Sequence, residues 1–279
     1  MEQTTPDKNM EAMIALETLE RYSGSSPNDF QSNLILTNFP RYVEYFAQSR
    51  QVKVFEGSMF KVAHCEEENV SILDFKIGSP AAALVVDICS FLPVRAAVLL
   101  GMCGGLRRRY RPGEYLVPVA SIRGEGTSDF YFSPEVPALA NFLMQKAVTD
   151  VLEDNGVPYH IGITYTTNMR FWEFNPPFIQ KLKETKAQGI EMECATLFSA
   201  SYARKFTLGA LLLVSDLPLM KEGIKTKQSS NEIFNKHMKE HVENGIAVLR
   251  RARTMQSHKV KGAYHRNLPK NIVEKKSFL

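Results

Sequence analysis

The sequence predicts a single α/β domain in which a central sheet is covered by helices on both faces. Short, continuously apolar segments such as residues 96–100 and 209–214 alternate with longer helical segments along the chain. Strands that are apolar at every position are typical of sheets buried on both faces. A chain of 279 residues is also long enough to bury one large core.

The first half of the chain is expected to contain three helices and three strands. An apolar stripe at helical spacing begins at Met10, and the glycine- and serine-rich residues after it predict a loop. A polar helix is predicted from about Pro40, and an alanine-rich helix is predicted from Gly78-Ser79-Pro80 to Phe91. Apolar runs predict strands at residues 33–37, 70–75 and 96–100.

The second half continues the alternation. Strands are predicted at residues 114–120, 161–166 and 209–214. Helical periodicity predicts helices over residues 136–153, 195–204 and about 231–253. Strands that alternate with helices in this way favour a sheet with helices packed on it.

Composition excludes several classes of protein. The apolar fraction of 44% and the charged fraction of 23% are those of a globular protein. No apolar run reaches the roughly 18–20 residues that a membrane span needs, and the polar start is unlike a signal peptide. The four cysteines form no C-x-x-C pair, so neither a zinc site nor a disulfide framework is expected. We expect a cytoplasmic protein that does not bind a membrane.

Charge is distributed unevenly along the chain. The net charge is +4, but residues 250–279 hold nine lysines and arginines and one acid, so the rest is mildly acidic. We therefore divide the chain into an amino-terminal extension (1–30), a catalytic domain (31–253) and a basic tail (254–279). A basic tail can bind nucleic acid. An extension that lies against its own domain or a sister subunit is the commoner explanation, and we do not expect nucleic-acid binding.

Three predicted strand ends carry the candidate chemistry, because ligands of α/β proteins bind at the carboxyl ends of the strands. The first strand end is the glycine cluster G-M-C-G-G-L at 101–106, where the backbone is expected to turn sharply and approach a ligand. At the second, Ser215 and Asp216 follow a buried strand. Desolvation would raise the pKa of such an acid and suit it to proton donation, although capping of the next turn is an alternative role.

The third strand end is G-I-E-M-E-C-A-T, residues 189–196, at a strand-to-helix junction. It places Glu191 and Glu193 two residues apart in an apolar setting. A buried carboxylate is costly unless something pairs with it. One glutamate could be solvated while the other caps the helix, or one could bind a ligand.

Together these segments resemble the nucleoside phosphorylase and nucleosidase superfamily, and within it the AMP nucleosidases. The resemblance covers roughly residues 31–250 and is most specific at residues 111–128 and in the S-D-L-P-L-M-K-E-G-I-K-T run at 215–226. It implies a nucleoside-phosphorylase-like fold with a mixed, twisted central sheet. Larger bacterial AMP nucleosidases have a long amino-terminal regulatory domain, so this chain is expected to be a short, catalytic form.

The resemblance implies a role for each strand-end motif. Asp216 matches the acid that protonates N7 of the purine leaving group, with Ser215 to orient it and Lys225 or Lys227 to tune it. Met192 and Glu193 match the residues that line the ribose. A carboxylate there would accept charge-assisted hydrogen bonds from the ribose hydroxyls and stabilise a cationic sugar. For Glu191, helix capping or a subunit contact is more plausible than chemistry.

The base is expected to contact residues from two segments. Phe171 and Trp172 occupy the position where relatives stack an aromatic ring on the base, although the single tryptophan could instead be a core residue. Cys103 and Gly104 would offer backbone contacts beside the base. Cys103 is not expected to be a nucleophile, because this glycosidic cleavage needs none.

The phosphate-binding positions argue for a hydrolase. Phosphorylase relatives hold free phosphate with an arginine and a serine where this chain has Leu99 and Met102, which donate nothing to an oxyanion. The departure favours water as the nucleophile. Arg41 matches another phosphate-contacting arginine, and Arg108 and Arg170 are further candidates to bind a 5′-phosphate or a phosphate effector. A solvated surface explains the run of arginines at 107–109 equally well.

A metal site is not expected. His237 and His241 lie four residues apart on the last predicted helix, but the residue after His237 is methionine, so H-E-x-x-H is absent. The mechanism implied above needs neither a metal nor a cofactor.

The sequence thus predicts hydrolysis of the N-glycosidic bond of AMP to adenine and ribose 5-phosphate. Three alternatives remain: a purine nucleosidase or phosphorylase acting on substrates such as methylthioadenosine, a nucleosidase for an aminodeoxyfutalosine-like substrate, and a catalytically silent nucleotide-binding protein. The resemblance also implies a homo-oligomer built from dimers, expected to be a hexamer of dimers, in which neighbours contribute to each site.

Overall fold

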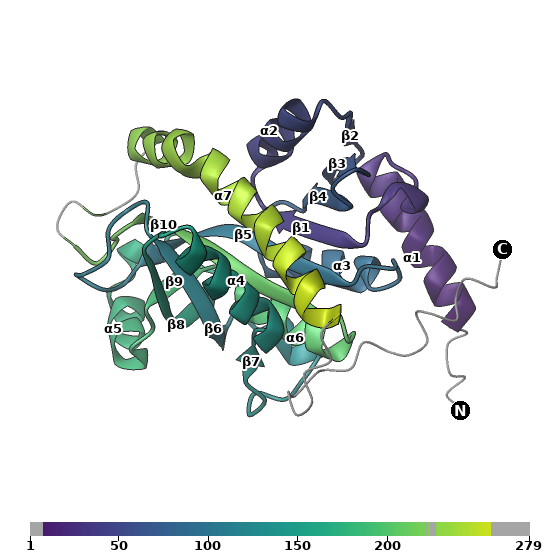
Figure 1. The fold of residues 1–279 in the computed structure, drawn as a ribbon. Coiled ribbons are helices and arrows are strands. Elements are labelled where there is room, and N and C mark those ends of the chain that lie inside the picture. Colours follow the sequence, from purple (N-terminus) through teal and green to yellow (C-terminus); the bar gives the residue numbers. More distant parts are fainter. Residues whose placement is uncertain (1–7, 221–222, 224–226, 258–279) are drawn as a thin grey trace, which may run out of the picture.

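A ten-stranded mixed sheet with helices on both faces forms the body of the molecule (Figure 1). This computed structural model describes residues 8–220, 223 and 227–257. The strands are β1 (Asn33–Thr37), β2 (Val54–Glu56), β3 (Lys61–Cys65), β4 (Val70–Asp74), β5 (Ala96–Gly105), β6 (Tyr115–Gly124), β7 (Ala138–Leu139), β8 (Tyr159–Thr167), β9 (Gly189–Glu191) and β10 (Leu208–Asp216). The predicted α/β class and the mixed central sheet are confirmed.

Seven α-helices accompany these strands in the described residues. They are α1 (Lys8–Ser23), α2 (Pro40–Arg50), α3 (Ser79–Cys89), α4 (Phe142–Asp154), α5 (Pro176–Thr185), α6 (Cys194–Ala203) and α7 (Lys227–Ser257). Two prolines begin α5, and Pro40 begins α2. Proline favours the first helical turn because that turn needs no backbone N–H from it.

The order of the sheet brings distant segments together. The strands follow β10-β6-β8-β9-β5-β1-β4-β3-β2, and β10 also pairs with β5. Strands β5, β10, β6, β8 and β9 therefore close into a ring. Strands β1, β5 and β10 are parallel, so their carboxyl ends lie at one edge. This is the edge at which the candidate strand-end residues were expected.

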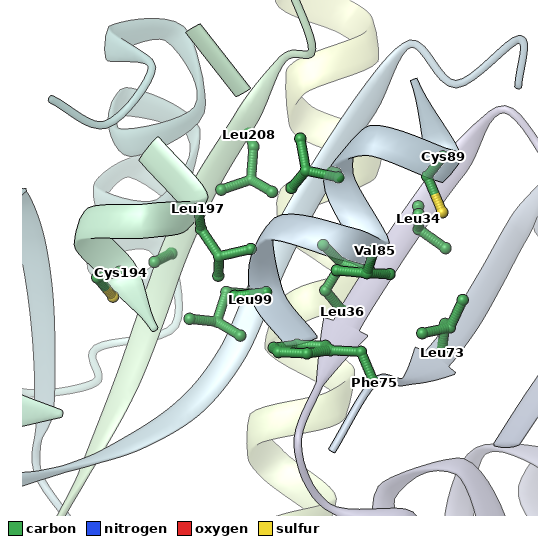
Figure 2. Packing of buried hydrophobic residues seen from close by; sticks show 14 of the residues in the cluster. Leu34, Leu36, Leu73, Phe75, Val85, Cys89, Leu99, Cys194, Leu197 and Leu208 are labelled. Atoms are coloured by element: carbon green, nitrogen blue, oxygen red, sulfur yellow. The ribbon is translucent and has the colours of Figure 1, made fainter. Parts of the chain in front are cut away.

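Two apolar cores lie on opposite faces of the sheet. One packs α1, α3 and α6 against the sheet, and Figure 2 shows its leucine-rich centre around Leu36, Leu99 and Leu197. The other packs α2, α4 and the long α7 against the opposite face. Because both faces are covered, β1, β4 and β10 are buried at every position, as their continuous apolar sequences predict.

Several element predictions were wrong or incomplete. The helix predicted over 136–153 begins only at Phe142, after β7, because the Asn141 side chain caps it by accepting from the N–H of Met144. Pro137 also lacks the N–H that a helix interior needs. The hairpin of β2 and β3 and the helix α5 were not predicted. The last helix is longer than the predicted 231–253 and continues through the first residues assigned to the tail.

The glycine cluster does not form the sharp turn that was predicted. Strand β5 continues through Gly105. A Cβ on Gly104 would lie 3.0 Å from Pro218, and one on Gly105 would lie 2.9 Å from Leu217. The glycines thus allow close packing against the segment after β10 rather than a change of direction.

The remaining global predictions concern features that the described residues test only in part. No helix among them is long and apolar enough to cross a membrane. The four cysteines, at positions 65, 89, 103 and 194, are buried and form no disulfide. The predicted tail lies outside the described residues from residue 258 onward.

Candidate functional site

A cavity of about 190 Å³ lies at the carboxyl-end edge of the sheet. Its walls come from the ends of β1, β5, β8, β9 and β10 and from the segments that follow them. The lining residues are Asn38, Phe39, Ile77, Met102, Cys103, Gly104, Thr167, Met169, Arg170, Trp172, Glu173, Ile190, Glu191, Met192, Glu193, Ser215, Asp216 and Pro218. The cavity therefore brings together all three strand-end motifs.

The Ser215–Asp216 pair lies where β10 ends. A bulge between Val214 and Asp216 places Asp216 opposite Gly104 of β5. Bulges of this kind re-aim side chains next to functional sites. The Ser215 hydroxyl lies 2.5 Å from Asp216 Oδ1 as its hydrogen-bond donor, and 3.2 Å from the carbonyl of Cys103. Ser215 thereby fixes the orientation of an almost fully buried carboxyl group.

Glu193 lies at the start of α6 and faces the same cavity. Its Oε1 accepts a 2.8 Å hydrogen bond from the backbone N–H of Gly78, just before α3. The hydroxyl of Ser79 donates to the carbonyl of Met192 at 2.7 Å. The start of α3 thus holds the Met192–Glu193 segment in place, and Gly78 has a positive φ of 99° that favours glycine.

Glu191 has a different role, because it caps α6. Its Oε2 accepts hydrogen bonds from the N–H groups of Glu193 (2.7 Å) and Cys194 (2.6 Å). Its Oε1 accepts from the Thr166 hydroxyl. These bonds satisfy donors that a helix start leaves unpaired. Helix capping was one of the two roles proposed for this glutamate from the sequence.

The two glutamates perturb each other. Burial and the nearby carboxyl of Glu191 raise the pKa of Glu193 to about 8. Burial also raises the pKa of Glu191, but its hydrogen bonds from Thr166, Cys194 and Glu193 favour the ionised form. The protonated form is therefore favoured more strongly at Glu193 than at Glu191. The sequence analysis had expected a carboxylate at that position.

The residues expected to contact the base are only partly brought together. Cys103, Gly104 and Trp172 line the cavity. Trp172 is also packed with Tyr165 and Ile190 in a small apolar cluster, so it contributes to the core and to the cavity wall. Phe171 is 70% exposed and is not among the lining residues. Its stacking role remains a prediction.

This chain has apolar side chains at the two positions that hold free phosphate in phosphorylase relatives. Leu99 is 1% exposed and packs in the core between the sheet and α3 and α6 (Figure 2). Met102 lines the cavity. Neither side chain can donate a hydrogen bond to an oxyanion.

The three candidate phosphate-binding arginines lie in different surroundings. Arg170 lines the cavity, is half exposed, and has its Nη1 3.7 Å from Oε1 of Glu173. Arg41 is exposed, donates to Asn235 at 2.6 Å and lies over the ring of Phe234. Arg108 is exposed, and neither it nor Arg41 is among the lining residues. Arg170 is thus the single cation that lines the cavity in the described part of the chain.

Of the two histidines set aside in the sequence analysis, His241 is built into the core and His237 is partly exposed. The Nε2 of the fully buried His241 lies 2.9 Å from the carbonyl of Leu211, and its Nδ1 lies 2.8 Å from the Tyr42 hydroxyl. Both ring nitrogens are therefore engaged. The described residues contain no group of three or more side chains that could hold a metal ion. The side chains of Lys225 and Lys227 lie outside the described residues.

Sequence reasoning missed three polar residues of the cavity, namely Asn38, Thr167 and Glu173. Asn38 directly follows strand β1, and Thr167 is the last residue of strand β8. Their positions at strand ends were the available signal. Glu173 lies in the T-T-N-M-R-F-W-E segment that carried the resemblance, but no role was assigned to it.

Comparisons with known proteins confirm the predicted nucleoside-phosphorylase-like fold. Residues 33–252 match the phosphorylase superfamily. The chain belongs to the phosphorylase superfamily. A crystal structure of AMP nucleosidase from Bacteroides thetaiotaomicron VPI-5482 is similar, with 34% identity, a TM-score of 0.78, and coverage of 88% of this chain and 99% of that one.

Other members of the superfamily are more distant in sequence. AMP nucleosidase of Escherichia coli (strain K12) is 25% identical over 85% of this chain, which spans 58% of that protein's length. Guanosine phosphorylase of Halorubrum lacusprofundi is 28% identical over 74% of this chain and 81% of that protein. Similar proteins thus include a nucleosidase and a phosphorylase, and membership of the superfamily leaves the reaction open.

Proposed function

We propose that this protein hydrolyses the N-glycosidic bond of AMP and releases adenine and ribose 5-phosphate. The observation that carries the proposal is the cavity itself, which holds an oriented acid, Asp216, and a second carboxyl group, Glu193, at its wall. The resemblance to AMP nucleosidases supports AMP as the substrate.

In the proposed reaction, Asp216 is the general acid. Ser215 donates to Oδ1, so the acidic proton is carried on Oδ2 and passes to N7 of the purine as the C1′–N9 bond breaks. The bonding electrons leave with the base, which departs neutral rather than as an anion. Water adds to C1′, and the proton that it loses restores the acid.

Glu193 is proposed to act on the sugar. Once ionised, its carboxylate accepts hydrogen bonds from the ribose hydroxyls and stabilises the positive charge that develops on the ring. The backbone N–H of Gly78 holds its Oε1 in place. Leu99 and Met102 offer no site for free phosphate, which favours water over phosphate as the nucleophile.

One observation favours a second candidate, a hydrolase of unphosphorylated purine nucleosides. Four carboxyl groups (Glu173, Glu191, Glu193 and Asp216) and one arginine line the cavity in the described residues. This balance suits a neutral ligand better than a phosphate dianion. In the AMP proposal, the half-exposed Arg170 binds the 5′-phosphate at the cavity rim.

The test is purine release from AMP, adenosine, inosine and methylthioadenosine, with and without phosphate. We expect AMP to exceed adenosine in kcat/KM by about tenfold or more, because a charge-assisted contact contributes roughly 1.5–3 kcal/mol. Equal turnover of both would favour the nucleoside hydrolase. A requirement for free phosphate would contradict hydrolysis altogether.

The acid is tested by Asp216→Asn, which keeps the shape and a donor but has no acidic proton. Turnover should fall by about 10²–10⁴-fold while adenine binding changes little. Near-normal turnover of this variant would contradict the leaving-group mechanism.

A further inference from the structure

Glu173 lines the cavity, and one of its carboxyl oxygens has no hydrogen-bond partner in the described part of the chain. Its side chain is only 9% exposed, and Oε1 lies 3.7 Å from Nη1 of Arg170. Its Oε2 is buried and makes no hydrogen bond with any of the described residues. Buried polar atoms are nearly always hydrogen-bonded, and the exceptions call for an explanation.

The position of Glu173 is fixed by its neighbours in the chain. Trp172 before it is packed in the apolar cluster with Tyr165 and Ile190. Asn175 after it caps α5 by accepting from the N–H of Phe178 at 3.0 Å. The backbone at Glu173 is therefore held from both sides. The side-chain torsions of Glu173, of which the terminal one is soft, are left to turn the carboxyl group toward a ligand.

Glu173 and Asp216 both line this cavity, and Glu193 lines it too. Trp172, the neighbour of Glu173 in the chain, clusters with Ile190, and Ile190 lies 3.2 Å from a Cβ built on Gly104. Gly104 in turn pairs with Asp216 across β5 and β10. A purine that takes a proton from Asp216 in this cavity is therefore enclosed by a wall that also contains Glu173.

We propose that Glu173 selects purines that carry an exocyclic 6-amino group, by accepting a hydrogen bond from that group. The inference rests on the proposed function, since it assumes that the base occupies this cavity. An ionised carboxylate has only acceptors. It pairs with the N–H of a 6-aminopurine and repels the carbonyl oxygen of a 6-oxopurine, so it both attracts one class of base and rejects the other.

The main test is the binding of free adenine and hypoxanthine, measured by calorimetry, with turnover of AMP and IMP alongside. The wild-type protein should bind adenine at least about tenfold more tightly than hypoxanthine. In Glu173→Gln, the amide can turn its NH₂ toward a 6-oxo group, and the adenine preference should fall by about tenfold or more. The matched control is Glu184→Gln on the exposed face of α5, which should keep the wild-type ratio.

A second measurement needs no variant. Unsubstituted purine has the same rings as adenine but no amino group, and it should bind the wild-type protein at least about tenfold more weakly. Equal binding of purine and adenine would overturn the inference, and so would an unchanged adenine-to-hypoxanthine ratio in Glu173→Gln. Either result would leave hydrolysis of AMP intact. Failure of the wild-type protein to bind any purine would overturn the proposed function and this inference together.

Discussion

Replacing Glu193 by glutamine should change how the stability of the protein depends on pH. The substitution is nearly isosteric, and the amide oxygen can still accept the hydrogen bond from the N–H of Gly78. What it removes is a buried group that titrates. The pKa of Glu193 is raised from 4.5 to about 8 by burial and by Glu191.

The sign and size follow from linkage. Between pH 4.5 and 8, the unfolded chain has lost the Glu193 proton while the folded protein still holds it, so the wild-type protein loses stability as pH rises. Each pH unit in this window costs about 1.4 kcal/mol, and the whole shift corresponds to a ceiling of about 5 kcal/mol. Below pH 4.5 the protonated Glu193 makes its full contribution to the free energy of unfolding, and above pH 8 this contribution is lost. Glu193→Gln has no titrating group at this position, so its stability lacks this dependence on pH.

The measurement is the free energy of unfolding by denaturant at pH 5, 6, 7 and 8 for both proteins. The difference between Glu193→Gln and the wild type should move in favour of the variant by about 1 kcal/mol per pH unit over this range. Glu66→Gln, on the exposed turn after β3, is the matched control and should follow the wild-type curve.

The reasoning would be refuted by a pH dependence of Glu193→Gln that parallels the wild type. That result would mean that Glu193 is already ionised over this pH range and that the raised pKa belongs to Glu191.

Three further predictions follow from the site. Because the proposed chemistry needs Glu193 ionised, kcat/KM for AMP should rise as pH increases toward about 8, and Glu193→Gln should remove this limb of the pH–rate profile. Arg170→Met should lower kcat/KM for AMP by about tenfold or more and leave adenosine unchanged, while Arg108→Met on the exposed surface should affect neither. Glu191→Ala should reduce the unfolding free energy at pH 7 by about 1–3 kcal/mol, because two backbone N–H groups lose their acceptor; an unchanged denaturation midpoint would contradict the capping role.

Much of the fold followed from local patterns in the sequence. The strands β1, β4 and β10 are buried at every position because both of their faces are covered, and their apolar central residues could be recognised from the sequence alone. A candidate site at the end of Gly189–Glu191 could also be predicted, because the polar residues of α/β sites gather at the carboxyl ends of strands.

The parts that were missed depend on contacts between distant segments. Strand β2 is at the edge of the sheet and β3 lies next to it, and neither strand is buried at every position, so their sequence pattern is weak. Gly104 looked like a turn residue, but it is small because Pro218 packs on it. The bond from Gly78 to Glu193 joins residues 115 positions apart, which no local pattern records.

Glu191 and Glu193 differ in their surroundings, because the first caps a helix and the second lines the cavity. Glu191 accepts bonds from the start of α6 and from Thr166, which oppose the burial that raises its pKa. Glu193 accepts hydrogen bonds from Gly78, Met192 and Asn38, but it is buried at the cavity wall, and burial is the larger cause of its raised pKa. The nearby carboxyl of Glu191 raises that pKa further. Under the proposed function, donors on a bound ribose and positive charge on its ring would favour the ionised form of Glu193, so its ionisation would be coupled to ligand binding.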